Sequence, residues 1–168
     1  LKNFTTIKIG GESSKIYFPE TLEDIDHLKG KISSKRTIIL GNGSNIAFKD
    51  SGYKNSIISL KHFKKPIRCI DDLHIVSMAG ISCARFAKFC FKNKIPGFEF
   101  MHGIPGSLGG AVAMNAGAFD DEIWNHIDSV RCILHNGTIK TYKSSSIKKS
   151  YRFVDRSEIK IFLDITFN

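Results

Sequence analysis

Residues 103–118 read Gly-Ile-Pro-Gly-Ser-Leu-Gly-Gly-Ala-Val-Ala-Met-Asn-Ala-Gly-Ala, and this stretch decides the fold. Five of its sixteen residues are glycine. Glycine leaves the backbone bare, so a bulky anionic group can approach it closely. We therefore expect a ligand-binding loop here rather than ordinary core.

A shorter stretch of the same kind lies upstream, Leu40-Gly41-Asn42-Gly43-Ser44-Asn45. Successive N–H groups in a glycine-rich turn can form a nest for a phosphate. Neither stretch is followed by the lysine of a P-loop, and the upstream one lacks the third glycine of a Rossmann fingerprint. Tight turns between strands are the alternative interpretation. Together, the two stretches predict a large phosphate-bearing cofactor between them.

The length and composition limit the classes of protein to which the chain can belong. The 168 residues are 42% hydrophobic and 24% charged, as expected for one large domain or two small ones. No apolar run approaches the roughly 20 residues of a membrane span, and the start resembles no secretory signal. The chain does not begin with Met, so we expect that it was trimmed or that its true start lies upstream.

The net charge is +9, from 25 Lys and Arg against 16 Asp and Glu. A phosphorylated small molecule, an anionic surface or nucleic acid could each suit a basic chain. The lysines are mostly dispersed and no stacked aromatic pattern accompanies them, so we expect no nucleic-acid partner. No two cysteines form a CxxC pair, so we expect no metal site but free, buried or half-buried thiols at Cys69, Cys83, Cys90 and Cys132.

Hydrophobic periodicity, together with the positions of glycine, proline and helix-capping residues, predicts an alternation of strands and helices. Strands are expected over 15–19, 36–40, 56–60, 73–79 and 160–167, with a hairpin of 127–134 and 138–142 around Asn136-Gly137. Thr21 should cap a helix that stops at Gly30. Ser82 should cap a second helix, which Pro96-Gly97 ends and whose apolar positions are Cys83, Phe86, Ala87, Cys90 and Phe91.

Four blocks of the chain resemble, in order, the FAD-binding part of bacterial UDP-N-acetylenolpyruvoylglucosamine reductases, also called UDP-N-acetylmuramate dehydrogenases. The blocks are 3–11, 40–45, 97–110 with 115–119, and Ser150-Tyr151-Arg152. The resemblance covers nearly the whole chain. It implies an α+β fold of the vanillyl-alcohol-oxidase type, in which subdomains 1–60 and 61–168 hold an extended FAD between them.

In this family NADPH reduces the flavin, which then passes hydride to the enolpyruvyl group of a UDP-sugar. The product, UDP-N-acetylmuramate, feeds peptidoglycan synthesis in the cytoplasm, and no membrane insertion is implied. For this chain the resemblance implies that the FAD diphosphate contacts Asn42, Gly43, Ser44 and Asn45. The rest of the cofactor would be lined by Gly103, Ile104, Pro105, Gly106, Ser107, Gly109, Gly110, Asn115, Gly117 and Ala118.

The resemblance makes Arg152 the catalytic cation that stabilises an enolate-like intermediate, and Tyr151 a substrate-positioning or packing residue. His102 is interpreted as a structural or cofactor-neighbouring residue. Two departures from the family pattern stand out. Phe153-Val154 follow Arg152 where the family continues Asp/Asn-Ser, and because the sequence stops at Asn168 we expect the family's C-terminal substrate-binding domain to be absent.

We therefore expect the chain to bind FAD but to need a separate polypeptide for turnover. A non-catalytic flavin-binding module, or a degraded paralogue of the reductase, is the alternative.

Overall fold

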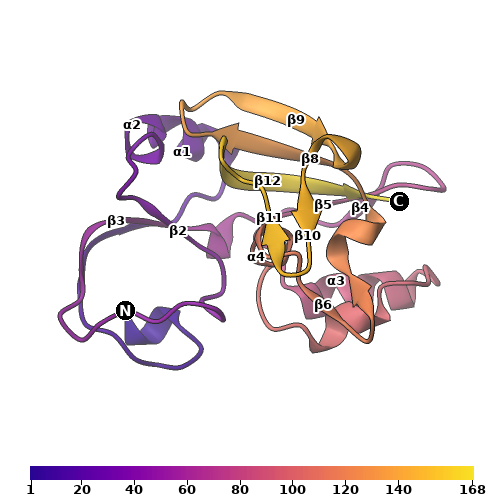
Figure 1. Cartoon of the computed structure of the whole chain (residues 1–168), viewed down its shortest axis with the longest axis horizontal. Coiled ribbons are helices and arrows are strands. Elements are labelled where there is room, and N and C mark those ends of the chain that lie inside the picture. Colours follow the sequence, from indigo (N-terminus) through magenta and orange to yellow (C-terminus); the bar gives the residue numbers. More distant parts are fainter.

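The computed structural model describes residues 1–168 and arranges them around two main β-sheets (Figure 1). The smaller sheet is parallel, in the order β1-β3-β2, with β1 (Ser13–Tyr17), β2 (Ile38–Leu40) and β3 (Tyr53–Ser59). The larger sheet is antiparallel, in the order β4-β5-β12-β8-β9. Its strands are β4 (Arg68–Cys69), β5 (Ile75–Met78), β8 (Ile127–Leu134), β9 (Ile139–Lys143) and β12 (Ile159–Phe167).

Four α-helices and two short hairpins complete the fold. The helices are α1 (Leu22–His27), α2 (Lys29–Ile32), α3 (Cys83–Lys92) and α4 (Leu108–Ala113). The hairpins pair β6 (Gly117–Ala118) with β7 (Asp121–Glu122), and β10 (Lys149–Ser150) with β11 (Phe153–Val154). Short 3-10 helices are η1 (Lys2–Phe4), η2 (Leu60–His62), η3 (Glu99–Gly103), η4 (Ile123–His126) and η5 (Ser144–Ser146).

The helix predicted from Thr21 begins as expected, but the prediction of its end is wrong. Thr21 and Asp24 form a reciprocal capping box, in which each side chain accepts a bond from the other's backbone N–H. Gly30 does not stop the helix, because it lies inside α2, which follows directly after Leu28. Tertiary packing of Ile25 and Ile32 outweighs the poor helix propensity of glycine here.

The second predicted helix is α3, and the Asn136-Gly137 hairpin is the β8–β9 hairpin, with Gly137 at φ +87°. One predicted core position is wrong. Phe91 is 80% exposed, although Cys83, Phe86, Ala87 and Cys90 on the same helix are buried. Phe91 lies one residue after Cys90, about 100° around the helix, and so turns away from the core.

Helix α4 was not predicted from the sequence, nor were the short strands β4, β6, β7, β10 and β11. The helix lies in the middle of the glycine-rich stretch, with Ser107 as its N-cap, and it buries Leu108, Ala111 and Val112. The expectation that this stretch stays out of the core is therefore wrong for its middle. Small residues let the helix pack closely on the chain that follows β5, and this contact stabilises a helix of low intrinsic propensity.

One apolar core joins the two sheets. A cluster of 34 buried residues includes Ile25 and Ile32 from the helices of the smaller sheet and Phe86 and Phe167 from the larger unit. Lys160 of β12 adds a polar link, because its Nζ donates to the carbonyl oxygens of Ser34 (3.1 Å) and Thr37 (2.8 Å). Burial lowers the pKa of this lysine. The two sheets are thus fixed to each other.

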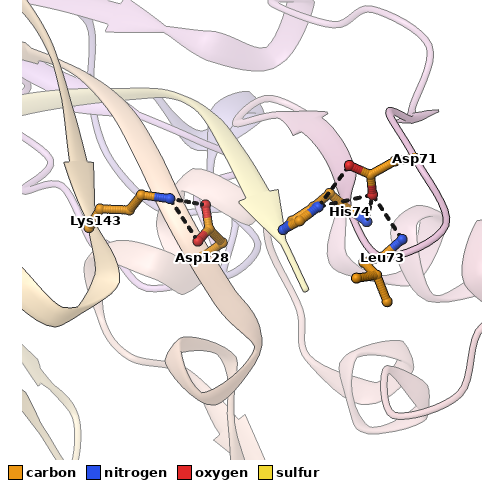
Figure 2. A network of polar contacts seen from close by, with 5 residues as sticks. All are labelled: Asp71, Leu73, His74, Asp128 and Lys143. Carbon is orange, nitrogen blue, oxygen red and sulfur yellow. Dashed lines mark hydrogen bonds and ion pairs between the residues drawn. The ribbon is translucent and has the colours of Figure 1, made fainter.

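A polar network closes one end of the larger sheet (Figure 2). The Asp71 carboxylate accepts the N–H groups of Leu73 (2.8 Å) and His74 (2.7 Å) and lies 2.9 Å from the His74 ring nitrogen Nδ1. Lys143 donates to both carboxylate oxygens of Asp128, at 3.0 and 3.1 Å. These contacts hold the β4–β5 turn and tie the start of β8 to the end of β9.

All four cysteines are free thiols. Three are buried as expected, and burial raises the pKa of Cys83, Cys90 and Cys132 to about 12. Cys69 differs from the expectation, because it is exposed on the edge strand β4. None of the helices combines the length and apolar character needed to cross a bilayer.

Candidate functional site

The first glycine loop, residues 41–45, directly follows β2 and leaves its N–H groups free. Thr6 donates to the carbonyl of Gly43 (3.0 Å), so the N-terminal segment closes the back of the loop. The N–H groups of residues 42–45 make no hydrogen bond within the chain. Four consecutive free donors directly after β2 can form a nest that suits a phosphate.

The second loop uses many of its backbone donors within the protein itself. The N–H of Leu108 donates to the Ile81 carbonyl (2.8 Å), and that of Gly109 to the Ala79 carbonyl (2.9 Å). The Ser107 hydroxyl oxygen accepts the N–H of Gly110 at 3.4 Å. These three donors at the start of α4 are used by the protein itself, whereas the N–H groups of Gly106 and Ser107 make no hydrogen bond within the chain. Beyond those two donors, the loop and α4 offer a surface of small apolar groups.

The two loops interlock through two glycines and two serines. The Ser44 hydroxyl donates to the Pro105 carbonyl at 3.0 Å. A Cβ on Gly106, which has φ +130°, would lie only 2.8 Å from Ser44 Oγ, and a Cβ on Gly41 would overlap Ser107 Oγ. In each loop a glycine therefore lies directly against a serine hydroxyl of the other, and the two loops pack closely together.

A pocket of about 580 Å³ lies in that gap. The first loop and its flanks contribute Ile39, Leu40, Gly41, Asn42, Gly43, Ser44, Asn45 and Ile46. The second loop and α4 contribute Ile104, Pro105, Gly106, Ser107, Gly110, Ala111, Ala113, Met114 and Ala116, and Arg152 completes the lining. Donors on one side and apolar groups on the other suit a ligand with a charged part and a flat apolar part.

A second pocket of about 400 Å³ adjoins the first, because both are lined by Leu40, Gly41 and Asn42. Its other lining residues are mostly polar: Asn3, Phe4, Thr5, Thr6, Ser59, Lys61, Lys64 and Ser82. The two lysines make it the cationic side of the site. The two pockets together wrap around the first loop and can accommodate an elongated anionic molecule.

The neighbouring glycines Gly109 and Gly110 show what the second loop leaves open. A Cβ on Gly109 would lie 2.8 Å from the Ala79 Cβ, so close packing of α4 explains this glycine. A Cβ on Gly110 would meet nothing closer than Ser107 Oγ at 3.5 Å, and Gly110 lines the pocket. No protein contact demands a glycine there. The free space above it fits a flat group lying on the helix.

Arg152 reaches the pocket from the β10–β11 turn. It is exposed and has φ +57°, a left-handed conformation that is uncommon for residues other than glycine. Its guanidinium carbon lies 5.8 Å from the centre of the exposed Tyr151 ring. Phe153 and Val154, which depart from the family pattern, form the strand β11 that continues from this turn.

The chain matches the FAD binding domain family over residues 14–143. It belongs to that family. Its similarity extends to UDP-N-acetylenolpyruvoylglucosamine reductases. That of Legionella pneumophila (strain Corby) is 34% identical over 155 residues, which cover 92% of this chain and 50% of the relative. That of Listeria monocytogenes serotype 4a (strain HCC23) is 35% identical over 171 residues, which cover 100% and 57%.

The chain spans about half the length of the curated relatives it matches, and the resemblance is to the FAD-binding portion. The reductase of Thermus caldophilus superposes with a TM-score of 0.80 at 24% identity, covering 99% of this chain and 59% of that one. Alkyldihydroxyacetonephosphate synthase superposes with a TM-score of 0.61 at 16% identity, covering 90% and 30%. These likenesses confirm the predicted α+β FAD-binding fold of the vanillyl-alcohol-oxidase type.

The structure brings together most of the residues singled out for this FAD binding domain. Those that line the larger pocket are Asn42, Gly43, Ser44, Asn45, Ile104, Pro105, Gly106, Ser107, Gly110 and Arg152. Those outside its lining are Gly103, Gly109, Asn115, Gly117, Ala118 and Tyr151. His102 lies in a separate pocket of about 300 Å³ beside Phe91.

Sequence reasoning missed several lining residues. Ala113, the last residue of α4, and Met114, its C-cap, follow Gly110 at the i+3 and i+4 positions. Helical spacing could therefore have identified them once the helix was recognised. No motif in the sequence around Lys61 and Lys64 points to a ligand. The two lysines lie at the site only because tertiary structure brings them beside the first loop.

Proposed function

We propose that the two adjoining pockets hold one FAD, with its diphosphate on the first loop and its isoalloxazine ring toward the second. The asymmetry of the loops is the observation that carries this proposal. The free N–H groups of residues 42–45 suit the diphosphate. The small apolar surface that Gly110, Ala113 and Met114 present to the pocket suits a flat ring. The polar pocket with Lys61 and Lys64 then receives the adenosine end.

We further propose that the protein to which this chain contributes its flavin site reduces UDP-N-acetylenolpyruvoylglucosamine with NADPH. The names of the curated relatives support the substrate, and the family resemblance supports NADPH and a cytoplasmic place in peptidoglycan synthesis. The net charge of +9 agrees with phosphorylated substrates. Bound FAD supplies the hydride chemistry, while the protein supplies binding, orientation and electrostatics.

Arg152 has the clearest electrostatic role among the residues of this chain. A guanidinium at the pocket stabilises the negative charge that develops on the enolpyruvyl group as it accepts hydride. Arginine suits this role because it stays charged and its planar fork matches a carboxylate. Tyr151, next to it and exposed, is proposed to contact the substrate.

Visible absorption after addition of FAD and gel filtration tests the cofactor site. We expect flavin bands to remain with the protein, and Gly110→Leu to weaken FAD binding at least about tenfold, or ~1.4 kcal/mol. The Cβ added at this position meets no protein atom closer than 3.5 Å and leucine has a higher helix propensity than glycine, so we expect thermal stability not to fall. Gly30→Leu is the matched control, since Gly30 is a helical glycine with nothing within 4 Å and lines neither pocket.

A chain that takes up no FAD, or a Gly110→Leu variant that binds it normally, would contradict this site. Anaerobic bleaching of the flavin bands by NADPH but not by NADH tests the reductant. Stable FAD binding without bleaching by either nucleotide would favour a non-catalytic flavin-binding module over the reductase function.

A further inference from the structure

Backbone strain is concentrated at two hairpins beside the second loop. Six residues other than glycine have positive φ, namely Lys8, Lys94, Asn115, Phe119, Asp120 and Arg152. Four of them belong to these hairpins or to the segment entering them. Phe119 and Asp120 form the β6–β7 turn, and Arg152 closes the β10–β11 turn. Such conformations persist only where surrounding contacts hold them, and they gather at functional sites.

Asn115 provides the contact that joins the two hairpins. It follows α4, is 2% exposed and has φ +44°. Its Nδ2 donates to Glu122 Oε2 at 2.7 Å in β7 and to the Ser150 carbonyl at 3.0 Å in β10. One amide group therefore links the end of α4, the β6–β7 hairpin and the residue just before the Tyr151–Arg152 turn.

The chemistry of its neighbours defines the orientation of this amide. The Glu122 carboxylate and the Ser150 carbonyl are both acceptors, so only the NH₂ group of Asn115 can face them. The Oδ1 atom is buried and has no partner in the chain. Glu122 thus directs the amide toward Ser150, and its charge strengthens the bond that does so.

We propose that Asn115 and Glu122 are positioning residues for Arg152. The carboxylate orients the amide, the amide holds the carbonyl of Ser150, and this anchors the strained turn that presents the guanidinium to the pocket. The inference rests on the proposed function for the role of Arg152, but the anchoring itself does not require a bound cofactor. It assigns Asn115 to the support of the site rather than to its lining.

Asn115→Gly is the variant that isolates the side chain, because glycine accepts φ +44° whereas alanine would be strained there. Hydrogen–deuterium exchange of the peptide 148–155, measured by mass spectrometry, reports on the turn. We expect exchange there to become about tenfold faster in Asn115→Gly, as for loss of one buried hydrogen bond. Glu122→Ala should do the same, and Glu122→Gln, which keeps an acceptor oxygen, should restore slow exchange.

Asn125→Ala is the control, because it removes the hydrogen bond that Asn125 donates to Asp121 (3.0 Å). That bond lies near the same hairpin but does not involve Ser150. It should leave exchange of 148–155 unchanged. Unchanged exchange in Asn115→Gly would overturn the proposal. Equally faster exchange throughout the chain would also overturn it, because it would indicate a general structural role.

The midpoint potential of bound FAD gives a second readout. Removing a nearby cation makes reduction of the flavin less favourable, so Arg152→Ala should lower the potential. Asn115→Gly should lower it too, and Asn115→Gly/Arg152→Ala should lower it no further than Arg152→Ala alone. An effect of Asn115→Gly that persists in full on the Arg152→Ala background would overturn positioning through Arg152.

The two proposals can fail separately. If the chain binds no FAD, the proposed function fails and the exchange measurement still decides the anchoring. If Arg152→Ala leaves the potential unchanged while exchange responds as expected, the anchoring stands and the proposed role of Arg152 beside the cofactor fails.

Discussion

The two glycine loops look alike in sequence but differ in how their bare backbone is used. In the first loop, Gly41 and Gly43 let the chain fold back on itself, against Ser107 and Phe4, while the neighbouring N–H groups stay free. In the second loop, the N–H groups of residues 108–110 are taken by the protein, while Gly110 leaves open space above the helix.

The difference shows that a count of glycines does not say what a loop binds. Free donors attract an anion, whereas an uncovered helix surface accepts a flat apolar group. One loop of each kind, held at a fixed separation by the Ser44–Pro105 hydrogen bond, matches a molecule that has both parts. Substitutions at individual glycines can therefore separate the contribution of each loop.

The largest effect is expected at Gly43, where φ is +70° and a Cβ would overlap the backbone oxygen of Phe4. Gly43→Ala should lower the free energy of unfolding by about 3 kcal/mol, combining left-handed strain with a backbone collision. Urea unfolding measures this. Gly103→Ala is the matched control, because nothing lies within 4 Å of that position. Equal urea midpoints for the two variants would remove the claim that the first loop is closed by its own chain.

An intermediate effect is expected at Gly109, where the added Cβ would meet the Ala79 Cβ at 2.8 Å. Gly109→Ala should cost about 2 kcal/mol through overpacking. Ala79→Gly opens space on the other side of the contact, so the double variant should be more stable than the sum of the two single changes predicts. Strict additivity would mean that α4 shifts away from Ala79 without penalty.

The smallest effect is expected outside both loops, at Asp128 of the network in Figure 2. The hydrogen bond from Lys143 is the main cause that lowers the pKa of Asp128 below its ordinary 3.8. The folded state thus favours the carboxylate. Its stabilising contribution is present above pH 3.8 and is lost as the pH falls through the lower folded-state value.

Asp128→Asn should therefore be slightly less stable than the unmodified chain at pH 7, and the difference should shrink as the pH falls below 3.8. Thermal unfolding across pH 2–7, with about 0.1 M salt to limit long-range effects, measures this. FAD binding should not change, since Asp128 lines neither pocket of the site. A difference that grows in acid would contradict the assigned sign.

Local signals predicted much of the fold. The Thr21 cap, the Ser82 cap and the Asn136-Gly137 turn act through neighbouring residues, so each is visible in the sequence. Helix α4 was missed because its glycines and alanines are weak evidence for a helix. Its first two N–H groups are satisfied by the carbonyls of Ile81 and Ala79, which lie 27 and 30 residues earlier in the chain.

The candidate site, too, could be predicted from the sequence only in part. The first loop and Arg152 could be named because contiguous residues resemble a family motif. The different states of the N–H groups in the two loops, the nearness of Lys61 and Lys64, and the contact of Asn115 with Ser150 depend on tertiary structure. No spacing along the chain encodes those contacts.

The shared core and the Lys160 link have a consequence for how a cofactor enters. Ile25 and Ile32 lie in one buried cluster with Phe167, and Lys160 donates to the carbonyls of Ser34 and Thr37. Separating the two sheets would expose this cluster and break both hydrogen bonds. The walls of the cleft are in place before a ligand arrives. Little binding free energy is then spent on ordering the protein when a ligand enters.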